Sequence, residues 1–88
     1  MIGYVYILRS LKNGRLYIGS TQDIKKRISK HNSGNVVATR NIRPLKLEYY
    51  QEYDNVGLAR NIERRLKNFK RKDFIEKIIR EKIIKSGQ

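Results

Sequence analysis

The amino-acid sequence predicts an α+β fold, a three-stranded antiparallel β-sheet flanked by helices, with the elements in the order β-β-α-β-α-α. Two observations predict the sheet. Asn13-Gly14 separates two short apolar and aromatic segments, which is a strong hairpin signal because both residues tolerate a positive φ. Residues 45–53 alternate apolar and polar side chains, as a half-buried strand does. A third observation predicts the helices, because apolar residues recur at helical spacing between these strands and after them.

The hairpin provides the first two strands, residues 3–9 and 16–19. Apolar or aromatic side chains occupy both faces of the first strand, with Tyr4, Tyr6 and Leu8 on one face and Val5 and Ile7 on the other. A strand that is apolar on both faces is expected at the centre of its sheet. Tyr6 and Tyr17 are therefore expected on paired strands.

The first helix is expected to follow Ser20-Thr21-Gln22-Asp23. Ser20 precedes Asp23 by three residues, as in a capping box. One narrow stripe of the helix contains Ile24, Ile28 and His31. Arg27 lies one turn before His31 at the edge of this stripe, so both side chains are expected to face the hairpin.

Residues 32–44 have no periodicity and are predicted to form an ordered loop. Thr39 and Arg40 lie side by side in this loop, where a hydroxyl and a guanidinium can grip a phosphate; the loop can equally be a solvated connection. The third strand follows Pro44. Its alternation predicts one shared face for Leu45, Leu47, Tyr49, Gln51 and Tyr53.

The second helix is expected to begin at Asp54 or Asn55 and to end near residue 69. Its predicted buried stripe consists of Leu58, Ile62, Leu66 and Phe69, with Ala59 beside it. Glu63 lies on the flank of this stripe, where it can form an i, i+4 pair with Lys67 or act as a ligand.

The last helix is predicted to be capped by Asp73, with Glu76 three residues later. Its broad apolar band is expected to pack on the core and to contain Phe74, Ile75, Ile78, Ile79 and Ile83. Ile84 falls outside this band.

The composition limits the possible partners. The chain has 88 residues, enough for one domain spanning residues 1–88, and carries 21 Lys and Arg against 8 Asp and Glu, a net charge of +13. Such an excess indicates an anionic partner, and nucleic acid is favoured over a membrane surface.

No apolar run approaches the ~20 residues that span a bilayer, and the N-terminus lacks a secretory apolar region, so a cytoplasmic location is expected. The absence of cysteine excludes thiolate zinc sites and leaves oxygen-ligand chemistry of the Mg²⁺ or Mn²⁺ kind.

Several of these residues, in this order, resemble a known family. Tyr4-Val5-Tyr6, Tyr17-Ile18-Gly19, Arg27, His31 and Glu63 are similar to the motifs of the GIY-YIG nuclease domain, in particular of its small single-domain, UPF0213-like members. The resemblance spans nearly the whole chain. One departure is that the first motif begins with tyrosine where the family name has glycine.

The resemblance implies a catalytic role for five residues. Glu63 would hold one divalent cation, Mg²⁺ or Mn²⁺, and Arg27 would donate to the oxygens of the scissile phosphate. Tyr17, with Tyr6 or His31, would orient or deprotonate the attacking water. A free phenol has a pKa near ~10 and an imidazole one near ~6.5, so the sequence leaves the general base open.

The expected function is that of a metal-dependent endonuclease that hydrolyses phosphodiester bonds, in DNA rather than RNA, directed by branched, single-stranded or damaged structure or by a protein partner. The expected nucleic-acid contacts are Ser20, Thr39, Arg40, Lys67 and Lys70. The alternative is a catalytically silent, basic nucleic-acid-binding protein, which the length and charge fit equally well.

Overall fold

The computed structural model describes residues 1–69 and 71–84, which contain three strands and three α-helices. In chain order these are β1 (Gly3–Ser10), β2 (Leu16–Thr21), α1 (Ile24–Asn32), the short 3-10 turn η1 (Arg40–Ile42), β3 (Leu45–Tyr53), α2 (Val56–Phe69) and α3 (Lys72–Glu81). The predicted order β-β-α-β-α-α is confirmed. Lys70 and the side chain of Phe69 lie outside the described part of the chain.

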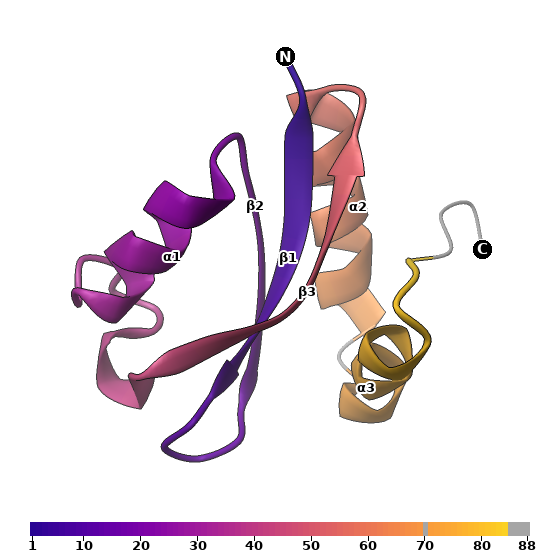
Figure 1. The fold of residues 1–88 in the computed structure, drawn as a ribbon. Coiled ribbons are helices and arrows are strands. Elements are labelled where there is room, and N and C mark those ends of the chain that lie inside the picture. The colour runs from indigo at the N-terminus through magenta and orange to yellow at the C-terminus, as the bar shows by residue number, and fades with distance from the viewer. Residues whose placement is uncertain (70, 85–88) are drawn as a thin grey trace.

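The three strands form one antiparallel sheet in the order β2-β1-β3, with β1 at the centre as expected. Tyr6 lies opposite Gly19 and Leu8 lies opposite Tyr17, so these four residues share one face of the sheet. Helix α1 lies on this face, whereas α2 and α3 lie on the other (Figure 1). The tyrosines of both motifs therefore point toward α1.

Strand β3 contains a bulge that the alternating sequence does not reveal. Leu47 pairs with Leu8 and Tyr49 pairs with Ile7, so Glu48 is an extra residue in the ladder. Leu47 consequently faces α1, and Tyr49 faces the opposite side. The predicted single face from residue 45 to residue 53 is wrong for this reason, and the strand bends along its length (Figure 1).

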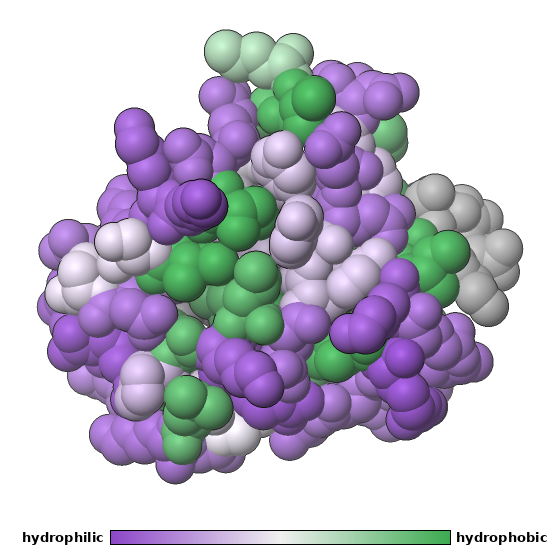
Figure 2. Space-filling view, viewed as in Figure 1, coloured by the Kyte–Doolittle hydropathy of each residue, from purple (hydrophilic) through white to green (hydrophobic). Residues whose placement is uncertain are grey.

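The surface shown in Figure 2 is mostly hydrophilic, with hydrophobic side chains gathered between α1 and β3. Tyr50 is 50% exposed on this side of the sheet. Within residues 1–69 and 71–84, no helix is both long enough and apolar enough to cross a membrane.

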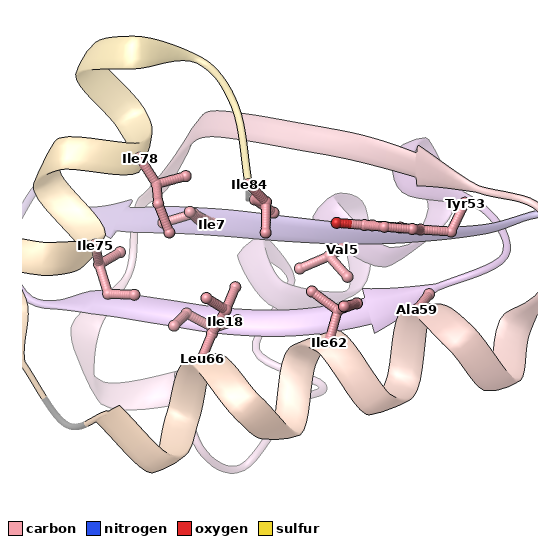
Figure 3. Close-up of a cluster of buried hydrophobic side chains, with 10 residues drawn as sticks. All are labelled: Val5, Ile7, Ile18, Tyr53, Ala59, Ile62, Leu66, Ile75, Ile78 and Ile84. Carbon is pink, nitrogen blue, oxygen red and sulfur yellow. The ribbon is translucent and has the colours of Figure 1, made fainter. Parts of the chain in front are cut away.

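The main core lies between the sheet and the helix pair α2 and α3 (Figure 3). Its buried residues are Val5, Ile7, Ile18, Tyr53, Ala59, Ile62, Leu66, Ile75, Ile78 and Ile84. The stripe of α2 is rotated from the predicted one, because Ala59 is fully buried and Leu58 is exposed. At this end of the sheet β1 approaches α2 closely: a Cβ added at Gly3 would lie 2.8 Å from the Cα of Val56.

The end of α3 corrects a second prediction. The helix stops at Glu81, and Lys82 adopts the left-handed conformation with φ 57°. The helical period therefore does not continue: Ile83 is exposed, and Ile84 is the residue that enters the core. The backbone N–H of Ile84 donates to Gln51 Oε1 at 2.9 Å, which attaches this segment to β3.

Two predicted caps are wrong, and both residues have other partners. Asp23, not Ser20, caps α1, and its Oδ1 accepts the backbone N–H of Lys26 at 3.0 Å. Helix α3 begins at Lys72, two residues earlier than a cap at Asp73 implies, so Asp73 lies inside its first turn. Asn55 caps α2, one of the two expected positions.

Candidate functional site

A chain of three buried side chains lies beneath α1. The hydroxyl of Tyr6 is 2.9 Å from Nε2 of His31, and Nδ1 of His31 is 2.7 Å from the hydroxyl of Thr39. These residues come from β1, from the last turn of α1 and from the loop before η1, and each is at most 1% exposed. Because both ring nitrogens of His31 have a partner, the ring is fixed in one orientation.

The environment keeps this chain uncharged at neutral pH. Burial, reinforced by the positive charges of Arg27 and Lys30, lowers the pKa of His31 to about 4. Burial is also the main cause that raises the pKa of Tyr6 well above its ordinary value; the charges of Tyr17 and Glu63 act in the same direction, and the guanidinium of Arg27 opposes them. His31 is thus a neutral imidazole able to accept a proton, and Tyr6 is a neutral phenol.

Gly19 makes room for this arrangement. A Cβ at position 19 would lie 2.3 Å from the hydroxyl oxygen of Tyr6, well inside van der Waals contact. A side chain here would displace the phenol from His31. The glycine of the second motif is therefore required by the close approach of the Tyr6 ring and not by a special backbone conformation.

Tyr17 is the partly exposed ring beside this buried chain. Its centroid lies 6.4 Å from that of Tyr6 and 5.0 Å from that of His31. The ammonium of Lys67 lies 5.4 Å from the centre of the Tyr17 ring, so a helix from the opposite face of the sheet reaches around the β2 edge to this side.

Glu63 lies at the same edge of the sheet. One carboxylate oxygen accepts the Ser20 hydroxyl at 2.5 Å, and the other lies 2.7 Å from the ammonium of Lys67. The predicted pair with Lys67 therefore exists. The Ser20 hydroxyl therefore donates to Glu63 and does not cap the N-terminus of a helix.

An open cleft of about 400 Å³ lies between the start of α1 and the start of α2. Ser20 and Arg27 line it, together with the cationic side chains Lys26, Lys30 and Arg60. The acidic residue in the lining, Asp23, is used as the cap of α1. Such a surface suits an anionic ligand with several oxygens, because guanidinium groups offer paired donors to phosphate.

The structure brings together the five residues expected to be catalytic. Tyr6, Tyr17 and His31 are in ring contact. Arg27 lowers the pKa of the Tyr6 phenol and Glu63 raises it, so both charges act on this phenol. They come from β1, β2, α1 and α2, four elements that are separated along the chain.

The predicted nucleic-acid contacts are more dispersed. Thr39 is fully buried with its hydroxyl on His31, so it is not available to a phosphate and instead supports the imidazole. Arg40 is exposed and lines a different cleft, where its guanidinium donates to the carbonyl of Gly34. Ser20 and Lys67 lie at the site, and Lys70 lies outside the described residues.

Sequence reasoning missed three cations of the cleft. Lys26 and Lys30 lie on the α1 face next to Arg27, and Arg60 lies one turn before Glu63 on α2. Their helical spacing from the two predicted residues is a signal that could have identified them.

The residues at the site fit a weakly held divalent cation. Across residues 1–69 and 71–84, no group of three or more His, Asp or Glu side chains could enclose a metal. Mg²⁺, however, is commonly bound by one or two carboxylates with waters and substrate phosphates completing its shell. Glu63, already oriented by Ser20, provides such a carboxylate beside the cationic cleft.

Comparison with known proteins gives consistent relatives. A UPF0213 protein of Staphylococcus saprophyticus is 38% identical over 76 residues, which cover 85% of this chain and 92% of the relative. A UPF0213 protein of Clostridium perfringens is 36% identical over 78 residues, covering 88% and 83% of the two chains. The solution structure of a UPF0213 protein of Bacillus halodurans matches with a TM-score of 0.59 at 32% identity, covering 93% of this chain and 86% of that one.

Residues 2–78 match the GIY-YIG catalytic domain, a span that includes both tyrosine motifs, Arg27, His31 and Glu63. The order of strands and helices agrees with that of the solved UPF0213 structure. The chain therefore belongs to the GIY-YIG catalytic domain family.

Proposed function

We propose that this protein is a metal-dependent endonuclease that hydrolyses phosphodiester bonds in DNA. The observation that carries the proposal is the position of the Glu63 carboxylate at the β2 edge, beside Tyr17 and next to a cleft lined by Arg27 and three further cations. Hydrolysis of a phosphodiester needs such groups, because it requires an activated water and stabilisation of the charge that develops on the phosphate.

Glu63 is the residue that would hold Mg²⁺ or Mn²⁺. Nucleases of this family typically use a divalent metal. Such an ion supplies charge neutralisation at the scissile phosphate and at the leaving oxygen. Ser20 holds the carboxylate in place, and the ammonium of Lys67 lies 2.7 Å from its other oxygen, where a bound cation would compete with it.

Arg27 would bind the non-bridging oxygens of the phosphate. Arg27 lines the cleft, and its positive charge lowers the pKa of the buried Tyr6 phenol, so one side chain acts on both the cleft and the buried hydrogen-bonded chain. Lys26, Lys30 and Arg60 would hold the neighbouring phosphates and orient the strand.

Tyr17 would orient the attacking water, because it is the partly exposed member of the three rings. Tyr6 and His31 are buried and act behind it. The neutral His31 would accept the hydroxyl proton of Tyr6 at Nε2. The Tyr6 oxygen would then accept the proton that the attacking water loses on the side of the cleft.

The substrate is expected to be DNA with a branched, single-stranded or damaged structure, or DNA presented by a protein partner. Binding through phosphate contacts gives weak sequence preference and a strong dependence on salt. Cleavage confined to one long recognition sequence would contradict this part of the proposal.

The test is cleavage of labelled DNA and RNA panels that include flaps, forks and single strands, with Mg²⁺, with Mn²⁺ and with chelator. Glu63→Gln is compared with Glu81→Gln, which removes the carboxylate from another i, i+4 pair, that of Lys77 and Glu81 on α3. We expect metal-dependent cutting that Glu63→Gln loses and Glu81→Gln keeps, with DNA binding unchanged or tighter in both. Binding without cutting by the wild type on every substrate would instead favour the catalytically silent binder.

A further inference from the structure

A second depression lies next to the cleft and has a different chemistry. It is a mostly apolar groove of about 520 Å³ between α1 and β3, in the region where Figure 2 shows hydrophobic side chains gathered at the surface. Its floor and walls are formed by Ile24 and Ile28 of α1, Leu47 and Tyr50 of β3, and Tyr4 of β1. None of these residues has a part in the proposed hydrolysis.

The two tyrosines give the groove an aromatic wall. The rings of Tyr4 and Tyr50 meet edge to face with their centroids 5.9 Å apart, and Tyr50 is half exposed. Tyr4 is the residue that begins the first motif in place of glycine, so the departure from the motif supplies one side of this wall.

The groove adjoins the cationic cleft. Gln22 and Asp23, at the start of α1, line both depressions, and Lys25 on the following turn lines the groove. Phosphate-binding cations thus lie on one side of this short segment and apolar and aromatic side chains on the other. A nucleotide has the same two parts, an anionic phosphate and a flat apolar base.

We propose that this groove is a base-binding subsite that takes an unpaired base of single-stranded DNA, stacked on Tyr50, while the neighbouring phosphate lies in the cationic cleft. Stacking on an aromatic ring requires a base whose face is exposed, which excludes a base within an intact duplex. The apolar side chains of the lining suit the methyl group that thymine carries and uracil lacks, so the occupant is a base of DNA rather than of RNA. The inference deepens the proposed function, on which it rests, by naming unpaired DNA as the substrate class.

The test measures binding alone, by fluorescence anisotropy of labelled oligonucleotides in chelator. The probes are a short oligothymidylate, the same strand with abasic positions that keep every phosphate, the matching oligouridylate, and a duplex. The variants are Tyr50→Ala, Tyr50→Phe, Tyr50→Leu, and Leu11→Ala as a control that removes an exposed apolar side chain at the hairpin tip.

We expect Tyr50→Ala to weaken binding of oligothymidylate by about 5- to 100-fold, as loss of one stacked base does. Tyr50→Phe and Leu11→Ala are expected to bind as the wild type does, and Tyr50→Leu, which keeps the apolar volume without the aromatic face, to behave like Tyr50→Ala. On the abasic strand all proteins should bind equally weakly, and the duplex and oligouridylate should bind more weakly than oligothymidylate.

An unchanged affinity for oligothymidylate in both Tyr50→Ala and Tyr50→Leu would overturn the subsite, and this is the result expected if the groove binds a protein partner. An equal loss of affinity on the abasic strand would also overturn it. Because no cleavage is measured, the two proposals fail separately. A nuclease whose binding ignores Tyr50 refutes the subsite alone, and Tyr50-dependent binding by a protein that cuts nothing refutes the nuclease alone.

Discussion

The two faces of the sheet are built from the same three strands but contain opposite chemistry. The face covered by α2 and α3 buries ten residues in an apolar cluster. The face covered by α1 has a smaller apolar cluster around Leu8 and Leu45, and it also buries Tyr6, His31 and Thr39 in a hydrogen-bonded chain. Strand β2 contributes to both, because Tyr17 and Ile18 are neighbours that point to opposite faces. One six-residue strand therefore contributes an apolar core residue to one face and an aromatic residue of the candidate site to the other.

The energetic consequences of the two faces differ as well. Burying apolar surface stabilises the fold in proportion to area, whereas a buried polar group at best recovers the hydrogen bonds it gave up in water. No buried side-chain nitrogen or oxygen in the described part of the chain lacks a hydrogen-bond partner, so the polar face is tolerated. We therefore expect variants of one face to change unfolding and variants of the other to change cleavage.

The largest expected effect on stability is that of Leu66→Ala, on the apolar face. Leu66 is 4% exposed within the main cluster, and deleting such a side chain lowers the free energy of unfolding by about 2–5 kcal/mol. Denaturant unfolding measures the loss, with the exposed Leu11→Ala as a control that should stay near the wild type. Cleavage at a temperature well below the transition should be unchanged; a parallel loss of cleavage would break the separation of the two faces.

The largest expected effect on activity is that of Arg27→Ala, on the polar face. Removal of one preorganised donor to the developing charge lowers the rate by about 10²- to 10³-fold. Single-turnover cleavage measures the loss, and Arg80→Ala on α3 is the charge-matched control. If both variants lost the same modest factor, Arg27 would contribute only net charge.

Gly19→Ala tests how tightly the polar face is packed. The new methyl group would lie 2.3 Å from the Tyr6 hydroxyl oxygen, so the ring must move and its bond to His31 must lengthen. Overpacking of this kind lowers the free energy of unfolding by about 1–3 kcal/mol, and here cleavage should fall with it. Gly57→Ala, in the exposed first turn of α2, is the control; wild-type behaviour of Gly19→Ala would show that the close approach has no importance.

The last effect concerns pH and is absent at neutral pH. The pKa of His31 is lowered to about 4 in the folded protein, below the ~6.5 of an unfolded chain, so below pH ~6.5 the unfolded state binds the proton more readily. The free energy of unfolding should therefore fall as the pH drops from ~6.5 toward 4, by at most about 1.4 kcal/mol per pH unit, and be independent of this group above that range.

Because the chain has a single histidine, NMR titration of its ring protons measures this pKa without ambiguity. His31→Gln should remove the pH-dependent loss between pH 6.5 and 4. The guanidinium of Arg9 lowers the pKa of Glu76, so this carboxylate contributes a separate loss of stability only at the acid end of the range, and His31→Gln should keep that part. An ordinary pKa near ~6.5 would mean that His31 is more exposed to water than the structure indicates.

Much of the fold could be predicted from the sequence because local patterns determine it. The Asn13-Gly14 turn, the doubly apolar β1 and the helical stripes gave the sheet order and the order of elements, and the spacing of Arg27 and His31 placed both toward the hairpin. Tyr6, Tyr17 and His31 lie in ring contact and Glu63 lies at the neighbouring β2 edge, while the catalytic roles that the family resemblance implies for them stay predictions.

What could not be predicted depends on contacts between distant segments. The bulge at Glu48 leaves no trace in the alternating sequence of β3, yet it places Leu47 and Tyr49 on opposite faces of the sheet. Ser20 has the sequence of a cap, but Glu63, 43 residues later, competes for its hydroxyl. No local sequence pattern indicates that the hydroxyl of Thr39 is hydrogen-bonded to the buried imidazole of His31.

The most direct test of the account compares Tyr17→Phe with its neighbour Ile18→Val by single-turnover cleavage of single-stranded DNA in Mg²⁺. We predict that Tyr17→Phe lowers the rate by about 10²-fold or more and leaves the free energy of unfolding unchanged. Ile18→Val should keep the rate and lower the free energy of unfolding by about 0.5–1.5 kcal/mol. Cleavage by Tyr17→Phe at the wild-type rate would contradict the assignment of the α1 face as the site of the chemistry.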